Sequence, residues 1–166
     1  MKKNIVLIGM PGSGKSTIGV LLAKALGLPF IDTDLLIQQS QNKLLQDIIN
    51  QEGIQKFLKI EEKVVSQMDV EGHVIATGGS VIYSPHAMSK LKQRGIVVYL
   101  ELEYEEIERR IKNIKTRGIV MEKGCTLWKL YEERVPLYKK YADIVVNCSD
   151  KDIEEVVETV IKATLY

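Results

Sequence analysis

The sequence contains few cysteines and no long apolar run. Its two cysteines, Cys125 and Cys148, stand far apart among 166 residues and form no CxxC pair, which argues against a zinc site or a redox motif. No segment approaches the ~20 apolar residues that cross a bilayer. The apolar run at residues 5–8 is too short for the core of a signal peptide. We therefore expect a cytoplasmic protein that has no membrane partner and keeps its thiols reduced.

The sequence also lacks an excess of charge of either sign. Lysine and arginine number 23 against 22 aspartates and glutamates, a net charge of +1, which gives no reason to expect nucleic acid as a partner. Any positive field must then be local, built by a few basic side chains around one site. The length fits a single domain over residues 1–166, and no repeat, low-complexity segment or linker divides it.

Short β-branched segments alternate with amphipathic helical segments along the whole chain. We predict strands at Asn4–Ile8, 30–31, 73–76, 96–100 and Ile144–Asn147. We predict helices at Lys15–Leu26, 35–39, 44–68 with a break near Gly53, 85–93, 103–115, Leu127–Tyr141 and 152–163. This alternation indicates an α/β fold, with a parallel sheet covered by helices on both faces. Because the carboxyl ends of parallel strands share one edge, we expect residues 9–16, 32–34 and 77–80 to meet there.

The segment between the first strand and the first helix is a phosphate-binding loop. Residues 9–16 read GMPGSGKS and match G-x-x-x-x-G-K-[ST] at every fixed position, in the strand–turn–helix context that the motif requires. The backbone N–H groups and the helix N-terminus would hold phosphate oxygens, Lys15 would reach the β- and γ-phosphates, and Ser16 would bind Mg²⁺. We assign nucleotide contacts to Gly12, Ser13, Gly14, Lys15, Ser16 and Thr17. The motif indicates a nucleoside triphosphate but does not identify the group that accepts the phosphoryl.

Two aspartates follow the second predicted strand. Asp32 and Asp34 are spaced i, i+2, so in extended backbone both side chains lie on the same side. Beside a triphosphate, one carboxylate could join the Mg²⁺ shell, while the other orients an acceptor hydroxyl and takes its proton. The structural alternative is that Asp34 caps the helix that follows it.

At this point the sequence resembles shikimate kinase, and the resemblance covers nearly the whole chain. It is carried by five blocks in order: GMPGSGKST at 9–17, FIDTD at 30–34, FLKIEEKVV at 57–65, ATGGS at 76–80 and ERVPLYKKYAD at 133–143. The resemblance implies a P-loop, nucleoside-monophosphate-kinase-like fold with a five-stranded parallel sheet in the order 2-3-1-4-5. It also implies a monomer that uses ATP and Mg²⁺ to phosphorylate the 3-hydroxyl of shikimate, in the chorismate pathway to aromatic amino acids.

The resemblance also implies roles for individual residues. Asp32 matches an aspartate in the Mg²⁺ shell, and Asp34 matches one that holds the acceptor hydroxyls and serves as base. The glycine turn at Gly78 and Gly79 would meet the substrate through its backbone. Three arginines match family positions: Arg134 on the substrate carboxylate, Arg117 in a lid over the phosphates, and Arg110 on the adenine. Residues of about 35–67 would bind substrate and those of about 113–126 would form the lid. Without the family, Arg110 on its charged helix would be assigned a solvated role. Arg134 follows two glutamates, so the alternative to its ligand role is a surface ion pair.

Two positions in the expected acceptor pocket depart from the family pattern. Leu58 stands where the family usually has an arginine that joins Arg134 on the carboxylate, and Ser80 stands where it usually has a third glycine. We assign both to the substrate-binding residues. Leu58 would make one wall of the acceptor pocket apolar, and Ser80 would make the turn more polar and the pocket narrower. The lid reads Arg117-Gly118-Ile119, where the family often has Arg-Pro-Leu.

Because these departures spare the nucleotide site, the sequence leaves two alternatives to shikimate open. One is a related kinase for another small hydroxylated acid or amino acid, such as homoserine. The other, from a different class, is an ATP-binding regulatory module that transfers nothing. A nucleotide kinase acting on a monophosphate is disfavoured, because the substrate-binding segment is short and Arg134 is of the carboxylate-binding type.

Overall fold

The computed structural model describes residues 3–112 and 118–165 and contains one five-stranded sheet. Its strands are β1 (Asn4–Ile8), β2 (Phe30–Asp32), β3 (Val74–Ala76), β4 (Gly95–Glu101) and β5 (Ile144–Asn147). Neighbouring strands pair in parallel, in the order β2-β3-β1-β4-β5. The predicted α/β fold and its strand order are confirmed.

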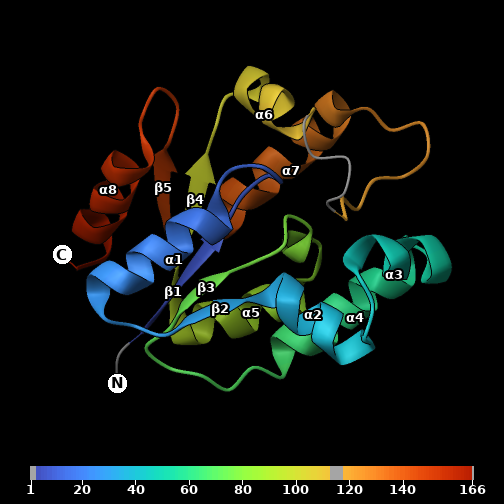
Figure 1. Ribbon diagram of the computed structural model, residues 1–166, viewed down its shortest axis with the longest axis horizontal. Helices are drawn as coiled ribbons and strands as arrows, with labels where there is room; N and C mark the ends of the chain where they lie inside the picture. The colour runs from blue at the N-terminus through green and yellow to red at the C-terminus, as the bar shows by residue number, and fades with distance from the viewer. Residues whose placement is uncertain (1–2, 113–117, 166) are drawn as a thin grey trace.

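The helices cover both faces of this sheet, giving three layers (Figure 1). They are α1 (Lys15–Leu26), α2 (Thr33–Gln41), α3 (Leu45–Glu52), α4 (Ile54–Ser66), α5 (Pro85–Arg94), α6 (Tyr104–Ile111), α7 (Leu127–Tyr141) and α8 (Ile153–Leu165), with a 3₁₀ helix, η1, at Val81–Tyr83. In Figure 1, α1 lies in front of the sheet beside α8, and α5 lies behind it. Right-handed crossovers between parallel strands require this division.

Two hydrophobic clusters stabilise the described part of the chain. The main core lies between the sheet and its helices, and the central strand β1 is buried at all five positions, as its apolar run predicts. The second cluster is small and lies among α2, α3 and α4, with Ile37, Ile48, Phe57 and Val120 buried in it. Val120 comes from the segment that precedes α7, so this cluster joins the helices beyond β2 to the segment that we expected to form the lid.

The element boundaries differ from prediction mainly at one helix. We expected a helix at 103–115, but α6 ends at Ile111, and residues 113–115 fall outside the described part of the chain. The expected break near Gly53 separates α3 from α4, where this glycine has a positive φ of 83°. Among the described residues, no helix is long and apolar enough to cross a membrane.

Candidate active site

The loop between β1 and α1 has the backbone geometry of a phosphate cradle. Gly12 and Gly14 have φ of 78° and 90°, left-handed values that L side chains rarely adopt, and Gly14 is the N-cap of α1. Ser13 N donates to Met10 O at 3.1 Å and closes the turn. The first-turn N–H groups of α1 therefore face the loop, where the helix N-terminus favours an anion.

Lys15 folds back over this loop. Its Nζ donates to the carbonyl oxygens of Gly9 and Met10, both at 2.8 Å, and the residue is only 8 % exposed. A full positive charge is thus held within the curve of the backbone that precedes it. This is the position from which a lysine can contact phosphate oxygens bound by the loop.

Ser16 and Asp32 form a pair of oxygen donors beside the loop. Ser16 Oγ donates to Asp32 Oδ2 at 2.7 Å, and Asp32 Oδ1 accepts from Asp34 N at 2.9 Å. The second bond makes Asp32 the N-cap of α2, so the alternative that Asp34 is the cap is wrong. A hydroxyl and a carboxylate are the hard ligands that Mg²⁺ prefers. Because the described residues contain no group of three or more metal-binding side chains, phosphate oxygens and water would have to complete the shell.

One cavity of about 330 Å³ brings most of the predicted residues together. Its lining includes Gly12, Gly14, Lys15, Ser16, Thr17, Asp32, Asp34, Gly78, Gly79, Ser80 and Arg134, with Gly118, Ile119 and Val120 on the side of the expected lid. Three strand ends thus meet at one edge, as the parallel topology predicts. Ser13, Leu58 and Arg110 are not part of this lining.

Arg134 supplies a buried positive charge in this cavity. It is 1 % exposed, its Nη2 donates to Val120 O at 2.7 Å, and its Nε donates to Tyr83 Oη at 3.3 Å. The guanidinium also stacks over the Tyr83 ring, 5.3 Å from the centroid. The alternative of a surface ion pair for Arg134 is therefore wrong. A guanidinium anchored in this way can bind a carboxylate through two parallel hydrogen bonds.

The glycine turn after β3 is required by its surroundings. A Cβ at Gly79 would lie 2.9 Å from Pro11 Cδ and 3.0 Å from Arg134 Nη1, so a larger residue would have to displace the proline ring or the guanidinium. The Gly79 carbonyl accepts a hydrogen bond of 2.6 Å from Tyr138 Oη, and burial raises the pKa of this tyrosine to about 12. Tyr138 is the tyrosine of the R-x-P-L-Y block. Its hydroxyl stays protonated at neutral pH and fixes the turn against α7.

Ser80 occupies the third position of the turn without strain. Its φ of −92° and ψ of −3° are ordinary values, and its hydroxyl donates to Glu61 Oε1 at 2.8 Å. The hydroxyl therefore makes the turn more polar, as expected, but it does so by bonding a buried glutamate.

Glu61 is the main site residue that sequence reasoning missed. It is 2 % exposed, and its burial, together with the nearby Asp34, raises the pKa of its carboxyl to about 7 against the lowering effect of the Ser80 hydrogen bond. The available signal was its spacing, because Phe57, Glu61 and Val65 are one helical face at i, i+4 and i+8, and all three are buried. A glutamate at a core position of an amphipathic helix is costly, and it marks a functional candidate.

Leu58 lines a second, smaller cavity of about 180 Å³ instead of the main one. This side cavity is bounded by Gln55, Leu58, Lys59, Glu61, Glu62, Ser80, Tyr83 and Ser84. Leu58 also packs against the second hydrophobic cluster. The two cavities share Ser80, so Leu58 lies one cavity away from the residues that line the main site.

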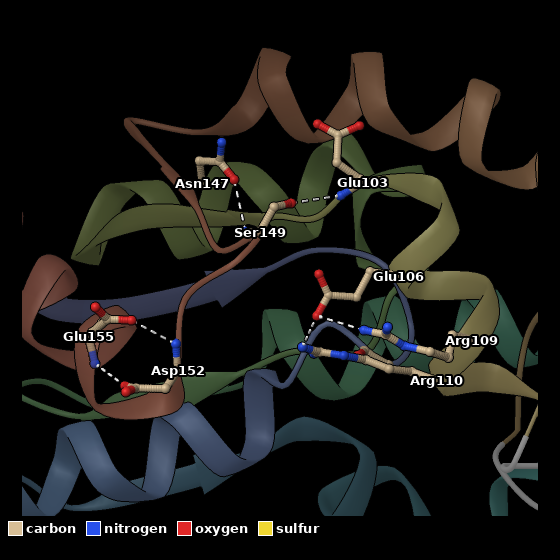
Figure 2. A network of polar contacts seen from close by, with 9 residues as sticks. Glu103, Glu106, Arg109, Arg110, Asn147, Ser149, Asp152 and Glu155 are labelled. Carbon is tan, nitrogen blue, oxygen red and sulfur yellow. Dashed lines mark hydrogen bonds and ion pairs between the residues drawn. The ribbon is translucent and has the colours of Figure 1, made fainter.

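Arg110 lies at the opposite end of the loop, in the network of polar contacts shown in Figure 2. Its Nη1 donates to Gly12 O at 3.2 Å and its Nη2 to Glu106 Oε1 at 2.6 Å, with Arg109 also directed toward Glu106. In the same view, Ser149 Oγ accepts from Glu103 N, which ties the start of α6 to the loop after β5. Arg110 is thus held beside the phosphate loop by an ion pair with Glu106 and by a hydrogen bond to the Gly12 carbonyl. Arg117 lies outside the described residues.

The comparison with known proteins agrees with this geometry. A family model described as shikimate kinase matches residues 11–165. The chain belongs to the shikimate kinase family. It is therefore a kinase that uses ATP, and the family resemblance carried by the five sequence blocks is confirmed.

Individual relatives extend the match over almost the full length. A shikimate kinase of Caldanaerobacter subterraneus subsp. tengcongensis is 38% identical over 97% of this chain and 95% of its own. One of Paracidovorax citrulli is 42% identical over 87% of this chain and 81% of its own. Among solved structures, shikimate kinase from Acinetobacter baumannii in complex with shikimate matches with a TM-score of 0.89 and 30% identity, covering 99% of this chain and 94% of that one.

Proposed function

We propose that this member of the shikimate kinase family transfers the γ-phosphoryl group of ATP to the 3-hydroxyl of shikimate. The observation that carries the proposal is the cavity in which a phosphate loop with Lys15, the carboxylate of Asp34 and the buried guanidinium of Arg134 meet. A triphosphate, a hydroxyl and a carboxylate are the three groups that such a site would hold together, and ATP and shikimate supply them.

In the proposed reaction, Asp34 orients the acceptor hydroxyl and takes its proton as the new O–P bond forms. The bond between the γ-phosphorus and the β–γ bridging oxygen breaks, and ADP leaves with that oxygen. Lys15 and the N–H groups of the loop stabilise the negative charge on the phosphoryl oxygens. Mg²⁺, held by Ser16 and Asp32, would neutralise further charge on the β- and γ-phosphates.

Arg134 positions the acceptor in this proposal. Its guanidinium would bind the carboxylate of shikimate, and the backbone at Gly78 and Gly79 would lie against the ring. We propose that residues 35–67, which cover most of α2 and all of α3 and α4, form the acceptor-binding segment and that residues 113–126 form the lid. Arg117 would close over the phosphates from that lid, and Arg110 would pack on the adenine. We further propose that the enzyme acts as a cytoplasmic monomer, as the family resemblance suggests.

Acceptor-dependent release of ADP tests the proposal. The purified protein is incubated with Mg·ATP and with shikimate or homoserine in a coupled assay, and we expect shikimate alone to sustain turnover. Turnover with homoserine but not shikimate would replace the acceptor while keeping the kinase chemistry. ATP binding without turnover on either compound would contradict transfer and support a regulatory module. The Asp34→Asn variant serves as the background control.

A further inference from the structure

The proposed reaction leaves one buried acid without a role. Glu61 comes from α4 and lines the side cavity, and only one of its oxygens has a partner among the described residues. Oε1 accepts from Ser80 Oγ at 2.8 Å, whereas Oε2 is buried and has no hydrogen-bond partner in that part of the chain. A buried, unpaired carboxylate oxygen is costly unless it carries a proton or meets a ligand.

The second oxygen of Glu61 faces the acceptor side of the site. A Cβ at Gly78 would lie 2.9 Å from Glu61 Oε2 and 2.7 Å from Asp34 Oδ1, so both carboxyl groups converge on the same glycine. The other charged or titratable groups near Glu61 are Arg134 and Tyr138 from α7, and Lys59, Glu62 and Tyr83 around the side cavity. Two carboxyl groups this close do not both ionise readily, so one of them keeps a proton.

We propose that Glu61 works as a neutral acid that positions Asp34 and the acceptor hydroxyl, with the Ser80 hydroxyl holding its carboxyl group in place. The inference rests on the proposed function and adds a positioning residue to it. With its proton on Oε2, Glu61 is a hydrogen-bond donor and leaves Asp34 as the single anion that accepts from the acceptor hydroxyl. Burial is the main cause of the raised pKa of about 7, so Glu61 loses its proton near neutral pH.

Two departures from the family pattern lie beside this carboxyl group, and they act on its pKa in different ways. Leu58 precedes Glu61 by three residues on α4, and both line the side cavity, so a cation at position 58 would lie next to the carboxyl group. Leucine supplies no charge there, so burial dominates and raises the pKa of Glu61, whereas the hydrogen bond from Ser80 lowers that pKa without cancelling the effect of burial. The two departures from the family pattern therefore bear on the same carboxyl group.

The pH dependence of the KM for shikimate tests the inference. Above about pH 7, we expect the KM of the wild type to rise by up to about tenfold per pH unit, because ionised Glu61 then faces Asp34. Glu61→Gln, which keeps a neutral donor, should remove that rise. Glu62→Gln on the same helix is the matched control, since Glu62 bonds Ser84 instead, and it should keep the wild-type profile.

Two further variants should move the pH midpoint of this rise in KM in opposite directions. Ser80→Ala removes a hydrogen bond that lowers the pKa of Glu61, so the rise in KM should begin at higher pH. Leu58→Arg places a cation beside the carboxyl group and should move the midpoint to lower pH. A KM that is flat with pH in the wild type, or that rises equally in Glu61→Gln, would overturn the inference while leaving shikimate kinase activity intact.

Absence of shikimate turnover at every pH would instead refute the proposed function, and the state of Glu61 can then be decided without turnover. Carbon-13 NMR of labelled glutamate side chains should show one carboxyl resonance that titrates near pH 7 and is missing from Glu61→Gln. If the resonance missing from that variant titrates in the ordinary range of glutamate, the inference fails.

Discussion

Replacing Glu61 by glutamine should make the stability of the protein less sensitive to pH. Glutamine keeps the shape of the side chain and can still accept from Ser80, but it cannot ionise. In the folded protein, burial raises the pKa of Glu61 from 4.5 to about 7. The unfolded chain exposes this carboxyl group to water, where it ionises at its ordinary pKa. The folded state therefore binds one more proton than the unfolded state between these two values.

The sign and size of the effect follow from this difference. The stability contributed by neutral Glu61 is fully present below about pH 4.5, is lost as pH rises toward 7, and stays lost above it. At about 1.4 kcal/mol per pKa unit, the wild type loses roughly 3 kcal/mol of unfolding free energy over this range through Glu61. Glu61→Gln escapes the loss, so its stability relative to the wild type should rise by roughly 3 kcal/mol between pH 4.5 and pH 8.

Urea denaturation of the two proteins at pH values across this range measures the difference, provided that the slope with urea concentration is unchanged. Glu62→Gln controls for the loss of a charge on the same helix and should track the wild type. If the unfolding free energies of the wild type and Glu61→Gln differ by the same amount at every pH, the reasoning is refuted. A constant difference would come from packing, because a difference caused by ionisation changes with pH.

The remaining predictions concern the site itself. Lys15→Ala should lower kcat by at least about 100-fold, because it removes the buried charge at the phosphate loop; steady-state ADP release measures it, and near-normal turnover would contradict the role. Asp34→Asn should bind ATP with unchanged affinity by calorimetry yet lose acceptor turnover; normal turnover would remove Asp34 as the base. Tyr138→Phe should destabilise the fold by about 1–3 kcal/mol, since it leaves the Gly79 carbonyl without its donor; equal urea midpoints would count against that bond.

Sequence reasoning anticipated the parts of the site that depend on local pattern. Residues 9–16 form a loop whose spacing of glycines and lysine is specific to phosphate binding, and the regular alternation of strands and helices places the ends of β1, β2 and β3 at one edge. The strand order itself came from the family resemblance, because periodicity does not tell which strands are neighbours.

The features of the site that sequence reasoning missed depend on tertiary contacts. The direction of Leu58, into a side cavity, is set by how α4 packs on the second hydrophobic cluster, which periodicity alone does not fix. The bond between Ser80 and Glu61 joins residues 19 positions apart on different elements. Asp32 caps α2 in place of Asp34 because β2 ends at Asp32 and the helix begins at the next residue. The ends of strands and helices are the features that sequence patterns predict least well.

The central claim is that one cavity brings the terminal phosphate of ATP to an alcohol held by Asp34 and Arg134. Phosphorus-31 NMR of the protein with Mg·ATP and shikimate tests it most directly, because it identifies the product as well as the loss of ATP. We predict a new phosphate monoester resonance that grows in step with ADP. ADP accompanied by inorganic phosphate alone, or a spectrum in which ATP persists unchanged, would contradict the account.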